Sequence, residues 1–224
     1  MRADRISLPV NARKWIDRSL PEDFEFKNRI TNTQEGEILV RDKWYSFSAT
    51  TEYQAQTVFY NWTARINIMF GVWVKAVDSH NDNTGWGGAK MWGVFPLGGS
   101  SGMKVFQMQL VRHLAELAWA PQLVLLSPDL VIDDTENGFK ISVQLGGQNA
   151  TINFVLNENH EIIKAFGKRY YETPEDFNIA AWHYIFSDHS VLGGVYVPTR
   201  AIGVYEKPEG EWKYWSNKLI SIEQ

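Results

Sequence analysis

The segment that most resembles a catalytic motif is residues 98–102 (GGSSG), which match the G-x-S-x-G pattern with Ser100 as nucleophile. In hydrolases this serine lies on a turn between a strand and a helix, and an acid and a histidine complete a triad. Side chains that fit these two roles follow at Asp133, Asp134, His160 and His183. The motif belongs to doubly wound parallel sheets, however, and the rest of this chain indicates an antiparallel meander. A Gly/Ser turn that caps a helix, with free amides for a small anion such as phosphate, explains the same residues.

Two further segments carry ligand types that bind metals. Asp78, His80, Asn81 and Asp82 place oxygen and nitrogen donors in one predicted turn, but no flanking cluster completes a set of four ligands, so we interpret the segment as a solvated hairpin loop. Residues 133–138 (DDTENG) are acidic, but their spacing is not that of a calcium-binding EF-hand loop, and a polar Asn-Gly turn accounts for them. The sequence therefore predicts no metal and no cofactor.

Titratable side chains also lie on predicted helices and strands. Glu116 follows Arg112 by four residues, which is the spacing of an ion pair on a helix, and His113 lies between them. If this helix plugs a cavity, one of the three supplies a polar anchor; otherwise the pair faces solvent. His183 shares a strand face with apolar residues and is interpreted as a core or rim histidine.

Helical periodicity is limited to two segments. Residues 9–20 have apolar positions at helical spacing and begin with a proline, which is favoured in the first turn of a helix. Residues 101–119 place leucines on one face, with Ser100 or Ser101 as the N-terminal cap and Pro121 as the stop.

Most of the remaining chain alternates between apolar and polar residues, which is the pattern of half-buried strands. The longest example is residues 58–70, and residues 139–145 and 152–156 form a predicted hairpin. Further strands are predicted at 24–33, 37–40, 43–53, 71–78 and 85–95 before the second helix, and at 161–171, 177–187, 194–206 and 211–223 after it. Regular turns without intervening helices indicate an antiparallel meander. We predict a single domain (1–224) of the mainly β class, a large curved antiparallel sheet or half-barrel packed by one or two helices.

Charge and composition exclude several classes of function. The net charge of -4 and the absence of a basic stripe argue against a nucleic-acid partner. No run of four basic residues occurs, which also argues against an anionic membrane surface as an electrostatic partner. The longest uncharged stretch, residues 141–157, is interrupted by polar residues, so no integral membrane segment is predicted. The absence of cysteine excludes thiolate chemistry and disulfides. The chain as written is expected to be cytoplasmic, or periplasmic or membrane-anchored if an N-terminal segment has been removed.

Four sequence motifs resemble those of an uncharacterised bacterial family, a domain of unknown function, over about Leu8 to Glu223. They are residues 15–21 (WIDRSLP), 110–116 (LVRHLAE) with 119–121 (WAP), 194–199 (GVYVPT) and 214–215 (YW). This resemblance implies a fold and no activity. The G-x-x-x-P element at 194–198, after a long meander, also resembles the periplasmic lipoprotein-carrier fold, in which a curled antiparallel sheet encloses a hydrophobic site plugged by helices.

The leading functional hypothesis is a binding module for an apolar or amphipathic small molecule, such as a lipid, in the concavity of the sheet. It depends on strands that are apolar on both faces and on the ten tryptophans. The predicted ligand-binding residues are Trp73, Trp92, Phe106, Trp182 and Tyr184 as lining, with His113 and Arg200 as polar anchors. The alternatives are a hydrolase that uses Ser100, a metal-dependent activity near His80 and Asp82, and a structural or protein-interaction domain. The oligomeric state is left open.

Overall fold

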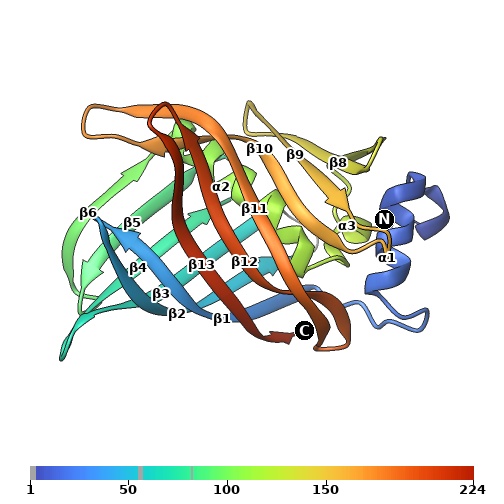
Figure 1. Cartoon of the computed structure of the whole chain (residues 1–224), viewed down its shortest axis with the longest axis horizontal. Helices are drawn as coiled ribbons and strands as arrows, with labels where there is room; N and C mark the ends of the chain where they lie inside the picture. The colour runs from blue at the N-terminus through green and yellow to red at the C-terminus, as the bar shows by residue number, and fades with distance from the viewer. Residues whose placement is uncertain (1–3, 55–57, 82) are drawn as a thin grey trace.

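The computed structural model describes residues 4–54, 58–81 and 83–224 (Figure 1). The elements before the long helix are η1 (Arg5–Ser7), α1 (Val10–Ser19), β1 (Arg29–Val40), β2 (Lys43–Gln54), β3 (Phe59–Met69), β4 (Val72–His80), β5 (Gly85–Met91) and β6 (Phe95–Ser101). The helical region contains α2 (Met103–Glu116), η2 (Leu117–Trp119) and α3 (Leu123–Leu126). The elements after it are β7 (Leu130–Thr135), β8 (Gly138–Leu145), β9 (Gln148–Leu156), β10 (Ile162–Glu172), β11 (Phe177–Leu192), β12 (Val195–Lys207) and β13 (Gly210–Glu223).

The thirteen strands in the described ranges belong to one antiparallel sheet in the order β6-β5-β4-β3-β2-β1-β13-β12-β11-β10-β9-β8-β7. Every neighbouring pair is consecutive in the chain except β1 and β13, which pair antiparallel and join the two halves of the meander. The sheet curls around α2, and α1 lies at one end of the half-barrel against β7, β8 and β12 (Figure 1). The predicted mainly β class and curved antiparallel half-barrel are therefore confirmed.

Helix α2 lies inside the curve of the sheet (Figure 1) and contacts β3, β4, β5 and β6 on one side and β9 and β10 on the other. Eleven of its fourteen residues are buried, although five of the eleven are polar or charged. A helix buried on all sides normally carries apolar residues throughout, so the polar side chains of α2 need partners on the sheet. Those partners form the candidate site described below.

The concave side under β11–β13 is filled by aromatic side chains. The ring of Trp119 lies 6.0 Å from that of Tyr184 and 6.3 Å from that of Trp215, and the Trp119 indole donates a hydrogen bond of 2.9 Å to the Pro198 carbonyl. Trp182 packs 4.5 Å from Tyr184. This half of the concavity is a packed core.

The observed elements differ from the sequence prediction at three places. The segments predicted at 24–33 and 37–40 belong to one strand, β1, because Gly36 continues the ladder between them. The two edge strands, β6 and β7, were not predicted, since the Gly/Ser run of β6 and the acidic end of β7 lack alternation. The serine cap predicted for α2 is wrong: its N-cap is Gly102, with φ of 106°, and no side chain caps it.

Gly85 allows α2 to lie directly against β5. A Cβ atom at this position would lie 2.3 Å from Phe106 Cα and 2.4 Å from Phe106 N, which are backbone atoms of α2. We therefore expect Gly85→Ala to lower the free energy of unfolding by about 1–3 kcal/mol, measured by urea denaturation. The matched control is Gly87→Ala, whose Cβ would meet only side-chain atoms of Asp78 and Gln109, at 3.1 and 3.5 Å. If both variants lose the same free energy of unfolding, the close contact between α2 and β5 at Gly85 is not the cause of the loss.

None of the helices in the described ranges combines the length and the apolar character that crossing a bilayer requires.

Candidate functional site

The centre of the candidate site is the carboxylate of Glu116, which is fully buried at the C-terminal end of α2. It accepts hydrogen bonds from Tyr53 Oη at 2.9 Å, from Tyr60 Oη at 3.1 Å and from Arg112 Nε at 2.7 Å. Burial raises the pKa of both tyrosines well above the ordinary value, so they remain donors at neutral pH. The carboxylate is saturated by these three donors and fixes α2 to β2 and β3.

Arg112 links this carboxylate to the sheet on the other side. Its Nη1 donates a hydrogen bond of 2.8 Å to Asp78 Oδ2, and its guanidinium carbon lies 4.5 Å from the Trp62 ring centroid. Burial disfavours the charged form, but the neighbouring Tyr60 and the carboxylates of Glu116 and Asp78 outweigh this cost and raise the pKa of Arg112 above the ordinary value. The guanidinium is therefore a permanent cation inside the half-barrel.

A pair of buried histidines lies beside the carboxylate. His80 Nε2 and His113 Nδ1 are 3.0 Å apart, and the rings of both stack on Tyr60. Burial lowers the pKa of His80 to about 4, and burial together with the neighbouring His80 lowers the pKa of His113 well below its ordinary value. Both rings are neutral at pH 7, and an N–H of one donates a hydrogen bond to the unprotonated nitrogen of the other.

A second buried arginine holds the opposite side of α2. Arg169 on β10 donates from Nε to the Met108 carbonyl at 2.9 Å, and its Nη1 donates to the hydroxyls of Tyr205 and Tyr214. Helix α2 is thereby fastened to β10 as well as to β2, β3 and β4, so its position in the half-barrel is well defined.

A pocket of about 420 Å³ remains between α2 and the first half of the sheet. It is lined by Ile38, Trp62, Ala76, Asp78, Gly87, Gly88, Ala89, Leu97, Gly98, Gly99, Ser100, Val105, Met108 and Glu172. Four glycines on β5 and β6 leave this space unfilled, and most of the other lining side chains are apolar. Its volume lies within the range of about 300–1,000 Å³ that is typical of small-molecule sites.

Two buried donors at this pocket lack hydrogen-bond partners among the described residues. Trp62 Nε1 belongs to a lining residue, and Arg112 Nη2 belongs to the guanidinium that covers the Trp62 ring. Both amide atoms of the fully buried Gln109 are also unpartnered, and Gln109 approaches Gly87 on the pocket floor. A buried donor without an acceptor costs about 1–3 kcal/mol. The site therefore favours a molecule that brings hydrogen-bond acceptors.

Side chains from the end of β10 and from the β10–β11 turn bridge the edge of the pocket. Ser100 Oγ donates a hydrogen bond of 2.5 Å to Glu172 Oε1, and Lys104 Nζ lies 2.5 Å from Asp176 Oδ2. These exposed contacts connect the β6 edge to the β10–β11 turn. In the described sheet, β6 and β10 are not neighbours, so side chains alone join these two parts. Exposed pairs of this kind contribute only about 0–1 kcal/mol to stability, so these two contacts at the edge of the pocket break easily.

The model of a family of unknown function, DUF6920, matches residues 6–223. The chain belongs to this family. The resemblance predicted from the sequence motifs to a family of unknown function is thereby confirmed. No curated protein sequence matches the chain.

Two solved structures have similar backbones. A DUF1329 family protein from Desulfovibrio piger has 10% sequence identity and a TM-score of 0.50, with 97% of this chain and 93% of that chain covered. A LolA superfamily protein from Nitrosomonas europaea has 11% identity and a TM-score of 0.46, with 95% and 91% covered. At such low identity the likeness to the DUF1329 protein shows a shared fold and carries no activity.

Four of the seven predicted ligand-binding residues of this DUF6920 member lie beneath or on α2. Phe106 and His113 are buried on α2, and Trp182 and Tyr184 belong to the aromatic core of β11. The pocket lining contains none of these four. Phe106 and His113 pack with His80, whereas Trp182 and Tyr184 pack with one another under β11, so the four form two separate groups.

The other three predicted residues lie away from the concavity. Trp73 on β4 faces outward and stacks under Arg65 at 4.2 Å, and Trp92 is partly exposed in the β5–β6 turn. Arg200 is exposed and forms an ion pair of 2.7 Å with Asp188. The alternation of residues in each strand predicted which side chains share a face, but it did not predict which face is concave.

The sequence prediction missed Tyr53, Tyr60 and Trp62 as site residues, and it placed the fourth residue that matters here, Asp78, in a turn. They occupy inward positions of three consecutive strands, and Tyr53 and Tyr60 are directly opposed in register. The solvent-facing alternative for Arg112 and Glu116 is wrong, because both are buried. The signal that was available is an ion pair at the end of a helix that carries apolar residues on most of its remaining positions.

The interpretation of residues 78–82 as a solvated hairpin loop is wrong for His80, which is 2% exposed and packed under α2. Asp82 lies outside the described residues. Within the part of the chain that the structure describes, no three His, Asp or Glu side chains are grouped closely enough to hold a metal.

The hydrolase triad is not assembled in the described residues. Ser100 is bonded to Glu172, Asp134 accepts from the Asn11 amide at 3.0 Å, and His183 lies 3.4 Å from Glu206. Asp133 forms an ion pair with Lys140 in the β7–β8 hairpin, at the opposite edge of the sheet from β6. The Gly/Ser segment is strand β6, and its glycines line the pocket.

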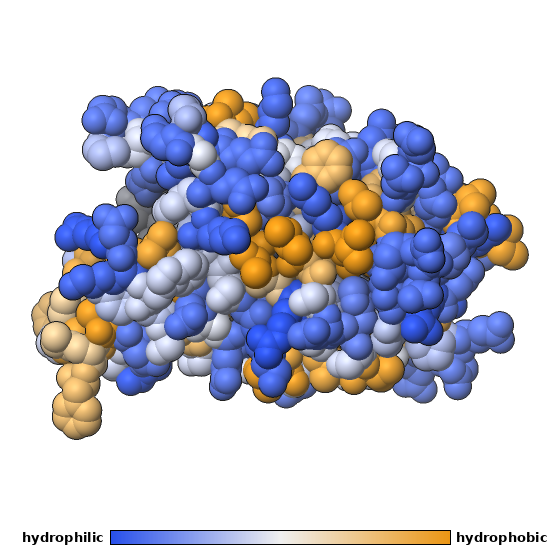
Figure 2. All heavy atoms as spheres, viewed as in Figure 1, coloured by the Kyte–Doolittle hydropathy of each residue, from blue (hydrophilic) through white to orange (hydrophobic). Residues whose placement is uncertain are grey.

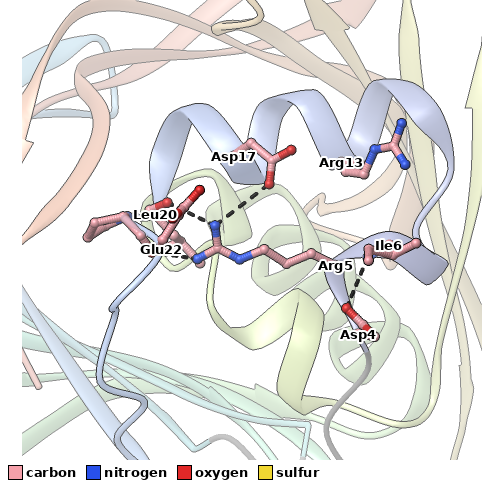
Figure 3. A pocket seen from close by; sticks show the side chains of 8 residues that line it. Asp4, Arg5, Ile6, Arg13, Asp17, Leu20 and Glu22 are labelled. Carbon is pink, nitrogen blue, oxygen red and sulfur yellow. Dashed lines mark hydrogen bonds and ion pairs between the residues drawn. The ribbon is translucent and has the colours of Figure 1, made fainter.

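A surface hollow of about 880 Å³ lies at the N-terminal helix (Figure 3). The Arg5 guanidinium extends across it and donates to the carbonyls of Leu20 and Pro21 at 3.1 and 2.6 Å, with Asp17 at 3.6 Å. These bonds fasten the N-terminal segment to the end of α1. The hollow thus has a structural explanation, and the smaller pocket beside α2 is the stronger ligand site.

Proposed function

We propose that this protein binds an amphipathic small molecule, an acyl chain with an uncharged, hydrogen-bond-accepting head, in the pocket between α2 and strands β1 and β3–β6. The observation that carries the proposal is the coincidence of an apolar pocket of about 420 Å³ with the unpartnered donors of Trp62 and Arg112. An apolar chain would fill the space over the glycines, and an acceptor in the head would satisfy the donors.

The local charge favours a neutral head group. Arg112 is paired with two carboxylates, Glu116 and Asp78, and a third carboxylate, Glu172, lines the same pocket. An anionic ligand would meet this excess of negative charge at low dielectric, where like charges repel strongly. An ester or amide carbonyl accepts the same hydrogen bonds without that cost.

The proposal treats residues 1–224 as a single domain. Helix α2 contacts strands from both halves, and β1 pairs with β13, so neither half encloses the pocket without the other.

Ala89→Phe tests the pocket directly. Ala89 faces Ala76 in the ladder and lines the pocket, so a phenyl group at position 89 occupies the space proposed for the acyl chain. We expect the affinity for a fluorescent monoacylglycerol analogue, measured by titration, to fall at least about tenfold, which corresponds to about 1.4 kcal/mol.

The matched control is Ala181→Phe, which adds the same group on the exposed face of β11 and is expected to bind as the unmodified protein does. Native mass spectrometry of the purified protein provides an independent measurement of a co-purified lipid. Equal affinities of the two variants, or no uptake of lipid in either assay, would refute the proposal.

A further inference from the structure

Apolar side chains are exposed at the ends of two adjacent hairpins, in the turns β3–β4 and β5–β6 and on the neighbouring residues of β3 and β6. They are Met69, Phe70, Trp92, Val94, Phe95 and Leu97, which we name the apolar tip cluster. Phe70 is fully exposed, and Val94 is 69% exposed. In Figure 1 the β3–β4 hairpin projects at the lower left, and Figure 2 shows apolar side chains gathered at the same end. Grouped exposed apolar side chains of this kind mark interaction sites.

The two tips are held together in a fixed geometry. Trp92 Nε1 donates to the Gly71 carbonyl at 2.9 Å, and Trp92 N donates to the Trp73 carbonyl at 2.9 Å. Trp92 has a φ of 50°, in a turn position that strongly favours Asn, Asp or Gly. A tryptophan here is strained and remains 42% exposed. The indole hydrogen bond fixes the two tips relative to each other, and the exposed part of the ring is available to an external surface.

A row of cations crosses the same strands behind the tips. Arg65 on β3 is directly opposite Lys75 on β4, and Lys75 is opposite Lys90 on β5. Like charges opposite one another destabilise a sheet. In the described ranges none of the three forms an ion pair with an acid, and Arg65 covers the Trp73 ring at 4.2 Å. This surface therefore favours an anionic partner.

The spacing between the tips and the cations matches the interface of a bilayer. Arg65 and Lys75 lie five and four residues from Phe70 and Gly71 at the β3–β4 turn, which is about 15 Å at about 3.3 Å per residue. Lys90 is only two residues from the shorter β5–β6 turn, but it lies level with Lys75 in the ladder and therefore at the same depth below the β3–β4 tip. Apolar groups of peripheral proteins enter the headgroup boundary by about 5–10 Å. The cations then lie within about 10 Å of the lipid phosphates, roughly one Debye length.

We propose that the apolar tip cluster inserts into the surface of an anionic lipid bilayer, with Arg65, Lys75 and Lys90 facing the phosphates. The acidic turns β10–β11 and β12–β13 lie on the other side of the same end of the half-barrel (Figure 1), which sets the orientation on the membrane. Leu97 belongs to the tip cluster and also lines the pocket, so the pocket is adjacent to the docked surface. Docking does not depend on what the pocket binds.

Flotation with lipid vesicles tests the docking. We expect the full chain to float with phosphatidylcholine vesicles that contain phosphatidylglycerol, and the bound fraction to decrease as salt is raised. The variant F70S/F95S removes two exposed rings and should reduce binding at least about tenfold. The variant K75Q/K90Q should lose the preference for the anionic lipid.

The control I179S/V191S removes two similarly exposed apolar side chains from β11 and should float as the unmodified protein does. Circular dichroism of every variant verifies that the fold is retained. The proposal is overturned if the unmodified protein does not float, or if F70S/F95S floats equally well. It is also overturned if the tips instead hold two copies of the chain together, seen as a loss of dimer in F70S/F95S by light scattering. A failure here leaves the monoacylglycerol titration unaffected, so the two proposals are tested separately.

Discussion

Glu116→Ala is expected to lower the free energy of unfolding by about 3–5 kcal/mol, because it removes one partner of a buried ion pair. The carboxylate accepts from Tyr53, Tyr60 and Arg112, and all three side chains are buried. Without it, two hydroxyls lose their acceptor, and the Arg112 guanidinium keeps only Asp78, whose side chain is partly exposed. Urea denaturation followed by far-UV circular dichroism measures the loss.

Glu116→Gln provides the matched control for this prediction. The amide oxygen still accepts hydrogen bonds, whereas the negative charge opposite Arg112 is removed. We expect Glu116→Gln to lower the free energy of unfolding by less than Glu116→Ala does. If both variants lose less than about 1 kcal/mol, the carboxylate is not what fixes α2 in the half-barrel.

Acid is expected to destabilise the fold between about pH 6.5 and pH 4, the interval set by the histidine pair. In the unfolded chain a histidine gains a proton near pH 6.5, whereas burial lowers the pKa of His80 in the fold to about 4. The unfolded state thus binds more protons in this interval, so the free energy of unfolding decreases as the pH falls. At about 1.4 kcal/mol per pKa unit, His80 alone accounts for about 3 kcal/mol, and His113 adds to the same loss.

The groups that face this pair are the ring of Tyr60, the ring of Phe106 and the ring of Tyr53. His80→Gln removes one titrating ring and keeps a polar side chain, so its stability should depend less on pH between 6.5 and 4. His160→Asn, in the turn before β10, is the control and should keep the full dependence, since asparagine also tolerates its φ of 61°. Urea denaturation at pH 7 and pH 4.5 measures the free energy of unfolding of both variants. If this free energy depends on pH in His80→Gln as strongly as in the unmodified protein, the histidine pair does not stay neutral in the fold.

The local pattern of the chain was sufficient to predict most strands. Alternation at residues 58–70 and 139–145 predicted β3 and β8 closely, because successive Cβ atoms of a strand point to opposite faces. The prediction failed for β6, where glycines replace the apolar residues that would reveal alternation. The same glycines open the pocket, so the feature that hid the strand is the one that makes the site.

The sequence by itself determined the class of the fold and the position of the long helix, since both depend on periodicities of a few residues. Only the tertiary structure decided which face of each strand is concave, and hence that Tyr60 and Trp62 line the interior while Trp73 lies outside. It also brought Arg65, Lys75 and Lys90 into one row, although no basic run exists in the chain. Pairing register and curvature arise from contacts between residues far apart in the chain, summed over the whole sheet. No local window of sequence contains that information.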